Sequence, residues 1–159
     1  MPVHLPQPKQ LRDLLADLLG RDVTLTPSAP FAPGADTPAS VALYVDDSLR
    51  ISALIACDLA FSAYAGAALG LIPVGDAAAA IGDGKVTDAI SENLYEVLNI
   101  AASTFNVTGA DHLRLHALHP AGPPLDPQVR ISTLTLGRRE DLAVDIAGYG
   151  AGLLSVVLL

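Results

Sequence analysis

The stretch from Thr87 to Asn106 constrains the fold more than any other part of this chain. Placed on a helix at about 100° per residue, it separates into an apolar side and a polar side. The apolar side consists of Ile90, Leu94, Val97, Leu98, Ala101 and Phe105, and the polar side of Glu92, Glu96, Asn99, Ser103 and Asn106. This pattern predicts a helix that packs against a core and exposes a polar stripe. The stripe is either a solvated surface or a functional site.

The other segments predict helices and strands around this one. Helices are expected from Lys9 to Leu19 and from Asp58 to about Leu69, because each pattern ends at a glycine suited to a C-terminal cap. Strands are expected at Asp22 to Thr26, Ser40 to Val45, Leu49 to Ala56, His112 to His119, Gln128 to Leu136, Leu142 to Ala147 and Leu153 to Leu158. Strands in hairpin-linked groups predict an α+β fold with a mostly antiparallel sheet covered by helices. Residues 1–159 are expected to form a single domain.

The segments between these elements are expected to be connections. Pro27 to Pro38 is rich in proline and glycine and predicts a loop, and Leu71 to Val86 predicts a connector with a short turn at Asp76 to Ile81. The acidic pairs Asp46-Asp47 and Glu140-Asp141 are interpreted as solvated turn residues rather than as an acid and a base.

Charge and hydropathy narrow the classes of function. The formal net charge is -8, and no basic cluster is longer than Arg138-Arg139, so a nucleic-acid-binding surface is not expected. The N-terminal residues do not have the pattern of a signal peptide, and no apolar run reaches the roughly 20 residues of a membrane span. A cytoplasmic protein with no membrane partner is expected.

Most catalytic and metal-binding motifs are absent. The single cysteine, Cys57, lies in an apolar run and is interpreted as a small buried hydrophobe. His112, Arg114 and His116 are expected on one face of a strand, where histidines at i and i+4 lie about 13 Å apart, too far to share a metal. No G-x-S-x-G, H-E-x-x-H or phosphate-loop motif occurs.

The predicted central helix resembles a known family. Its sequence E-N-L-Y-E-V-L-N-I-A-A-S, Glu92 to Ser103, is similar to the signature helix of the CheC/CheX/FliY chemotaxis phosphatases, which carries a Glu-x-x-Asn motif. Glu96 and Asn99 supply this pair. The helix that ends in Leu-Gly before the first strand, the helix ending at Leu69-Gly70 and the last three strands also follow the family's order. A single motif resembles the CheX-like members, which tend to pair as homodimers through their sheets.

The resemblance implies an activity and a partner. The family removes phosphate from the aspartyl phosphate of a CheY-like receiver domain. Asn99 would orient the attacking water, because an amide both donates and accepts hydrogen bonds, and Glu96 would pair with a lysine of the partner. Glu92 and Ser103, on the same stripe, would take part in docking. The chain would need no cofactor of its own, because the Mg²⁺ would be carried by the receiver domain.

The motif departs from the family pattern in two places. Glu92 stands where the family usually has Asp or Ser, and it puts two like charges at i and i+4. A shifted register that starts at Asp88 restores the acid but places Tyr95 where the Asn belongs. The family's downstream proline is matched only loosely, by Pro120, Pro123 or Pro124.

Three interpretations follow from the sequence. The first is a CheX-like phosphatase that acts through Glu96 and Asn99. The second is a non-catalytic CheX/CheC-like module that binds a partner or dimerises, with an exposed edge of the C-terminal strands as the expected dimer surface. The third is an unrelated α+β domain, which burial of Asn99 against the core would indicate.

Overall fold

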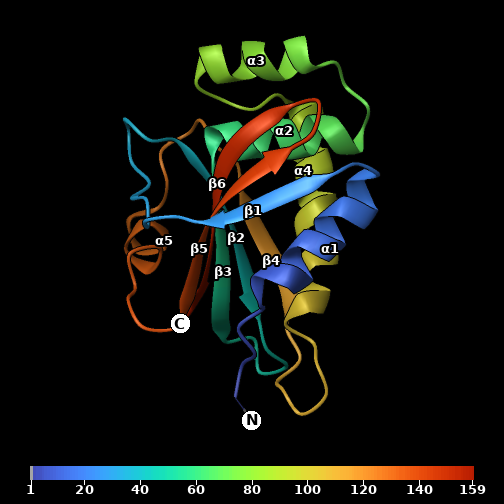
Figure 1. The fold of residues 1–159 in the computed structure, drawn as a ribbon. Coiled ribbons are helices and arrows are strands. Elements are labelled where there is room, and N and C mark those ends of the chain that lie inside the picture. Colours follow the sequence, from blue (N-terminus) through green and yellow to red (C-terminus); the bar gives the residue numbers. More distant parts are fainter. Residues whose placement is uncertain (1) are drawn as a thin grey trace.

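The computed structural model describes residues 2–159, whose strands form a six-stranded antiparallel sheet (Figure 1). The strands are β1 (Val23–Pro27), β2 (Ala39–Val45), β3 (Ile51–Asp58), β4 (Arg114–His119), β5 (Arg139–Ile146) and β6 (Gly150–Leu158). Their order across the sheet is β1-β5-β6-β3-β2-β4, and every neighbouring pair is antiparallel. The predicted α+β class with an antiparallel sheet is confirmed.

Helices lie on both sides of the sheet, but unequally. They are α1 (Pro8–Leu19), α2 (Leu59–Leu69), α3 (Val74–Asp83), α4 (Asp88–Ala101), the short 3-10 helix η1 (Ala102–Thr104) and α5 (Pro127–Ser132). Figure 1 shows α1 and α4 to the right of the sheet and the short α5 to its left, with α3 at the top. No helix among residues 2–159 is long and apolar enough to cross a membrane.

The main core lies between the sheet and helices α1, α2 and α4. Alternate residues of the central strands face these helices and are buried, among them Tyr44, Ile55 and Val156. The opposite face of the sheet carries a smaller cluster, formed by Val41, Leu43, Leu54, Ala56 and Val157 and packed against Phe31, Leu125 and Val129. This second face is covered by α5 and by loops rather than by long helices.

Helices α2 and α4 approach each other closely because α2 presents glycine to α4. A Cβ built on Gly66 would overlap the backbone carbonyl oxygen of Ile90, and one built on Gly70 would overlap the side chain of Asn93. Because the two helices are so close, the Asn93 Nδ2 can donate a hydrogen bond to the Gly66 carbonyl oxygen, at 3.0 Å. The packing therefore fixes α4 against α2.

Most predicted elements are confirmed, including the helix that Asp58 caps: its carboxylate accepts a hydrogen bond from the Phe61 N–H at 2.8 Å. The strand expected from Gln128 to Leu136 is wrong. Asp126 and Pro127 instead begin the helix α5, where the Asp126 carboxylate accepts from the Gln128 N–H, and turns follow. Asp at the N-cap followed by Pro in the first turn is a helix-start signal, and here it prevails over β-propensity.

The connector expected from Leu71 to Val86 contains more structure than predicted. The alanines form a complete helix, α3 (Val74–Asp83), which packs on α2 through Ala77 and Ala80. Alanine has the highest helix propensity, and Gly84 closes the helix in the left-handed conformation.

Glu140 and Asp141 do not lie in a turn, as expected, but inside β5. Asp141 accepts two hydrogen bonds from the Arg139 guanidinium, at 2.8 and 2.9 Å, and one from Ser155 Oγ at 2.6 Å. Arg139 also donates to the carbonyl oxygens of Thr133 and Thr135, which follow α5. The acid is thus part of a nearly buried ion pair that ties the α5 segment to the sheet.

The regular strand face expected to carry His112, Arg114 and His116 is also interrupted. Strand β4 contains a bulge where it pairs with β2, since Leu43 lies opposite Ala117 but Tyr44 lies opposite Leu115. His116 falls at this bulge, so Arg114 and His116 do not continue one regular face. No group of three or more His, Cys, Asp or Glu side chains within residues 2–159 is placed to hold a metal ion.

The C-terminal strands are not at an edge of the sheet. Strand β6 lies between β5 and β3, and β5 lies between β1 and β6, so the expected dimer surface on these strands is wrong. The free edges belong to β1 and β4.

Candidate functional site

The candidate site is the outer surface of α4, and its position follows from how this helix is held. Thr87 caps the helix, with its hydroxyl accepting from the Ile90 N–H at 3.2 Å. Ile90, Leu94, Val97, Leu98 and Ala101 are all buried. The buried Tyr44 hydroxyl donates to the Leu98 carbonyl oxygen at 2.6 Å, beside Asn99 in the sequence. The backbone that carries the candidate pair is thus fixed from the core side.

The four predicted site residues share the outer surface of α4 and its extension. Glu92, Glu96, Asn99 and Ser103 are all exposed. Glu96 and Asn99, at i and i+3, are neighbours on the helix surface, with Cβ atoms about 5–6 Å apart. Within residues 2–159, the Glu96 carboxylate and the Asn99 amide have no side-chain hydrogen bond or ion pair. Burial of Asn99 against the core, which would have indicated an unrelated domain, is not observed.

The polar stripe ends earlier than the sequence indicates. The α-helix stops at Ala101, and Ser103 lies in η1, where the backbone winds more tightly. Asn106 was expected on the stripe but has a structural role. Its amide donates to the Leu113 carbonyl oxygen at 2.9 Å and accepts from the Leu113 N–H at 2.7 Å. Asn106 therefore holds the connection to β4 in place.

A shallow depression adjoins the polar stripe. The sequence does not indicate that the residues lining it lie together. Its volume is about 400 Å³, and it is lined by Ser91, Glu92, Tyr95, Leu118 and Pro120. Tyr95 exposes 42% of its surface. Of the three prolines that loosely match the family pattern, only Pro120 lies beside α4 here, whereas Pro123 and Pro124 line a different pocket. The sequence could not choose among them, because the choice depends on where β4 ends.

Two other reactive groups are buried in the core and are not exposed on this surface. Burial raises the pKa of the Cys57 thiol well above its usual value, so the thiolate nucleophile is disfavoured. Burial likewise raises the pKa of the Tyr44 hydroxyl. The expected burial of Cys57 is confirmed.

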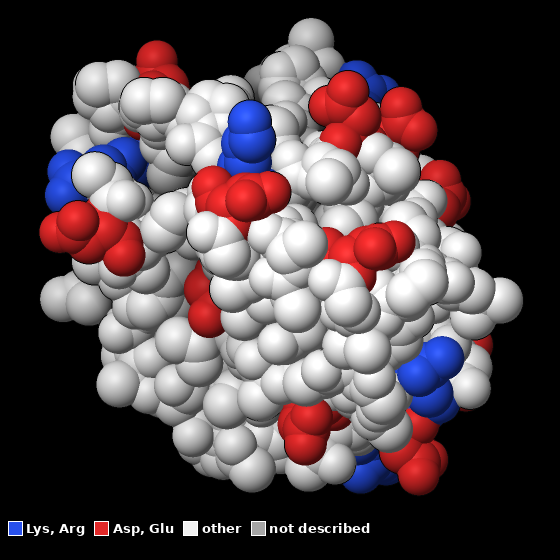
Figure 2. All heavy atoms as spheres, turned by 90° about the horizontal axis from the view of Figure 1, so that it is seen from above, with Lys and Arg blue, Asp and Glu red and all other residues white. Residues whose placement is uncertain are grey.

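The face of the molecule at the α3 end carries no extended basic surface (Figure 2). Seen from the α3 end, acidic and basic groups are scattered over a largely uncharged face (Figure 2). Both acidic residues of the site belong to α4 itself, so the site is negatively charged. Its carboxylates can accept hydrogen bonds from a partner and can form an ion pair with a positively charged side chain. The Asn99 amide can also donate hydrogen bonds.

Several solved structures have a similar architecture. CheX in its complex with CheY, BeF3 and Mg²⁺ from Borrelia burgdorferi matches with a TM-score of 0.50 and 7% identity, over 93% of this chain and 92% of that one. FliY from Thermotoga maritima matches with a TM-score of 0.50 and 12% identity, over 93% and 82%. FliM in its complex with FliG from H. pylori matches with a TM-score of 0.53 and 9% identity, over 93% and 84%.

The chain has the CheX/FliY/FliM fold. The resemblance to the CheC/CheX/FliY family is thereby confirmed at the level of three-dimensional structure. No protein-family model matches the sequence, and a search of curated protein sequences found no match. The CheX-like fold is therefore shown by the arrangement of the chain, and the roles of Glu96 and Asn99 remain predictions.

Proposed function

We propose that this chain is a cytoplasmic CheX-like phosphatase that hydrolyses the aspartyl phosphate of a CheY-like receiver domain. The observation that carries the proposal is the free side chain of Asn99. It lies on the outer surface of a helix that is fixed from the core side, next to the exposed Glu96. The similar structure of CheX was solved bound to CheY, which supports a receiver domain as the partner.

The mechanism needs few groups from this chain. A side chain that enters a partner's active site must be exposed and must have no partner of its own. Asn99 would orient the attacking water through hydrogen bonds of its amide. Glu96 would form an ion pair with a basic side chain of the receiver. An acyl phosphate already hydrolyses readily, so positioning one water is a sufficient contribution. Any Mg²⁺ would be bound by the receiver domain.

The test follows the decay of phosphorylated receiver domains from the same organism with the wild-type chain and with Asn99→Ala. We expect the wild type to accelerate the decay and Asn99→Ala to lose about 10²-fold or more of that acceleration. Because Asn99 is exposed, the variant should keep the wild-type fold. The matched control is Gln128→Ala, which removes an exposed amide from α5 on the opposite side of the sheet and should leave the rate unchanged.

A second candidate, a non-catalytic docking module, is favoured by one observation. The FliM domain of similar fold was solved in complex with FliG, so the fold also serves protein association. Binding of a receiver or another chemotaxis protein, with no acceleration of dephosphorylation in any pairing, would contradict the phosphatase and favour this module. Loss of binding in Glu96→Gln would then place the docking surface on α4.

A further inference from the structure

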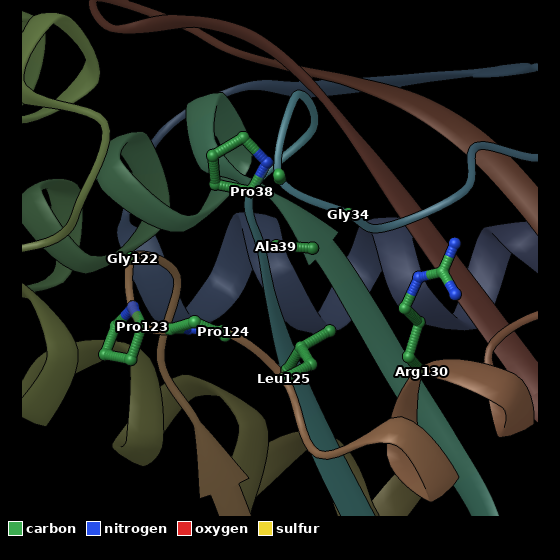
Figure 3. Close-up of a pocket in the computed structure, with 9 residues that line it drawn as sticks. Gly34, Pro38, Ala39, Gly122, Pro123, Pro124, Leu125 and Arg130 are labelled. Atoms are coloured by element: carbon green, nitrogen blue, oxygen red, sulfur yellow. The ribbon is translucent and has the colours of Figure 1, made fainter.

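A second pocket lies on the face of the sheet opposite α4. It has a volume of about 310 Å³, near the lower end of the range for small-molecule sites. The loop before β2 and the segment between β4 and α5 form its two sides (Figure 3). Its lining consists of Gly34, Ala35, Pro38, Ala39, Gly122, Pro123, Pro124, Leu125 and Arg130.

Arg130 is the one charged residue in this lining, and it lies at one end of the pocket. Its Nε donates to the Pro33 carbonyl oxygen at 3.1 Å, which holds the guanidinium beside the loop. Within residues 2–159, the other guanidinium N–H groups have no hydrogen-bond partner, and no acid pairs with Arg130. These free donors are suited to an acceptor with two oxygens.

The other residues of the lining carry no polar side chain. Figure 3 shows Leu125 and Ala39 between Arg130 and the opposite end, which is formed by Gly122 and Pro123. Ala39 is buried in β2, and its short side chain leaves space above the sheet. A ligand would therefore meet a cation at one end and an uncharged surface along the rest of its length.

We propose that this pocket binds a small organic carboxylate with an aromatic or aliphatic body. The carboxylate would accept hydrogen bonds from the Arg130 guanidinium, and the body would lie against Ala39, Leu125 and Pro38. Inorganic phosphate does not fit this description, because it has no apolar part to cover the lining. The site is independent of the phosphatase proposed for α4.

The probe is 3-phenylpropionate, titrated into the isotopically labelled chain and followed by NMR. We expect saturable shifts of the Gly34 and Ala39 amides with a dissociation constant on the order of 1 mM, as is typical for a ligand of this size. The neutral amide 3-phenylpropanamide has the same shape without the charge and should bind at least about tenfold more weakly. No saturable shift, or equal binding of the acid and the amide, would overturn the proposal.

Amino-acid substitutions test whether the acid binds in this pocket or is attracted by the charge of the protein in general. Arg130→Gln should weaken binding of the acid at least about tenfold, whereas the matched control Arg50→Gln, an exposed arginine in the β2–β3 turn, should not. Arg130→Gln could also disturb the loop held at Pro33. Pro124→Glu therefore provides an independent test, because it leaves Arg130 in place and adds a negative charge to an exposed position of the lining. Undiminished binding of the acid to Pro124→Glu would overturn the proposal.

Discussion

At the scale of single residues, three asparagines on or near α4 have three different roles. Asn93 donates to Gly66 and joins two helices, and Asn106 pairs with both backbone groups of Leu113. Asn99, which lies between them in the sequence, has no partner within the described chain. The sequence pattern correctly predicts that Asn99 is exposed. The same pattern places Asn106 on the polar stripe, where it does not belong. The roles of the other two depend on residues that only the folded chain brings near.

Asp58, the N-cap of α2, should make stability depend on pH. Burial raises its pKa above the usual value of 3.8, although hydrogen bonds from the Phe61 and Leu153 N–H groups oppose this. A carboxyl group whose pKa is raised in the folded state stabilises most below its unfolded pKa. That contribution is lost as the pH rises through the folded pKa.

Asp58→Asn keeps an acceptor for the cap and removes the charge. We expect the free energy of unfolding of Asp58→Asn, relative to wild type, to increase as the pH rises from about 3.5 to about 7. Urea denaturation at a series of pH values measures this difference. A difference that stays constant or decreases with pH would show that burial does not raise the pKa.

At the scale of elements, the contact between α2 and α4 determines where the candidate site lies. Gly66→Ala should force the helices apart, because its Cβ would overlap the Ile90 carbonyl oxygen and the Ile90 side chain. We expect a loss of about 1–3 kcal/mol in the free energy of unfolding, measured by chemical denaturation. If Asn99 acts as proposed, phosphatase activity should fall as well, because α4 shifts.

The matched control for Gly66→Ala is Gly82→Ala on α3. A Cβ at Gly82 meets no atom within 4 Å, and alanine favours the helix by up to about 1 kcal/mol. This variant should therefore be as stable as the wild type or more stable. Equal effects of the two substitutions would show that the α2–α4 contact does not constrain the helices.

At the scale of the whole molecule, the free edges of the sheet restrict how two copies could pair. The homodimer implied by the family resemblance stays a prediction, and it cannot extend the sheet at β5 or β6, because both strands are already paired on both sides. Edge strand β4 carries a bulge and three basic or titratable side chains, Arg114, His116 and His119, which disfavour pairing. Strand β1, with the sequence V-T-L-T-P, has no bulge and no charged side chain, and its one proline stands at its last position. We therefore expect a dimer to extend the sheet at β1.

Hydrogen exchange at two protein concentrations tests this expectation. The Ala147 N–H donates to the Asp22 carbonyl oxygen, and the Ser28 N–H donates to the Asp141 carbonyl oxygen. In this register the N–H groups of Thr24 and Thr26 point to β5, and those of Val23 and Leu25 point outward. Dimerisation should slow hydrogen exchange at the Val23 and Leu25 N–H groups and leave exchange at Thr24 and Thr26 unchanged. Sedimentation velocity at the same two concentrations shows whether the dimer forms. A monomer at every concentration, or a dimer with fast exchange at Val23 and Leu25, would contradict the prediction.

The sequence predicts the local features of this fold better than its long-range ones. The periodicity of α4, the helix expected from Asp58 and the strands expected before and after Asp46-Asp47 all arise within short segments and are confirmed. The order of the strands is set by distant residues, and so is the hydrogen bond of Ser155 to Asp141, whose partners lie on two neighbouring strands. For the same reason the sequence alone could not place the Pro120 depression or the Arg130 pocket.

The central position of β6 has a consequence for how the protein is made. Among the six strands, β6 is the last to leave the ribosome, yet it joins β1 and β5 on one side to β3, β2 and β4 on the other. Until it emerges, the nascent chain carries two partial sheets, each with an unpaired inner strand that can pair wrongly with another chain. The sheet can therefore be completed only after β6 has been synthesised, although β6 lies near its middle.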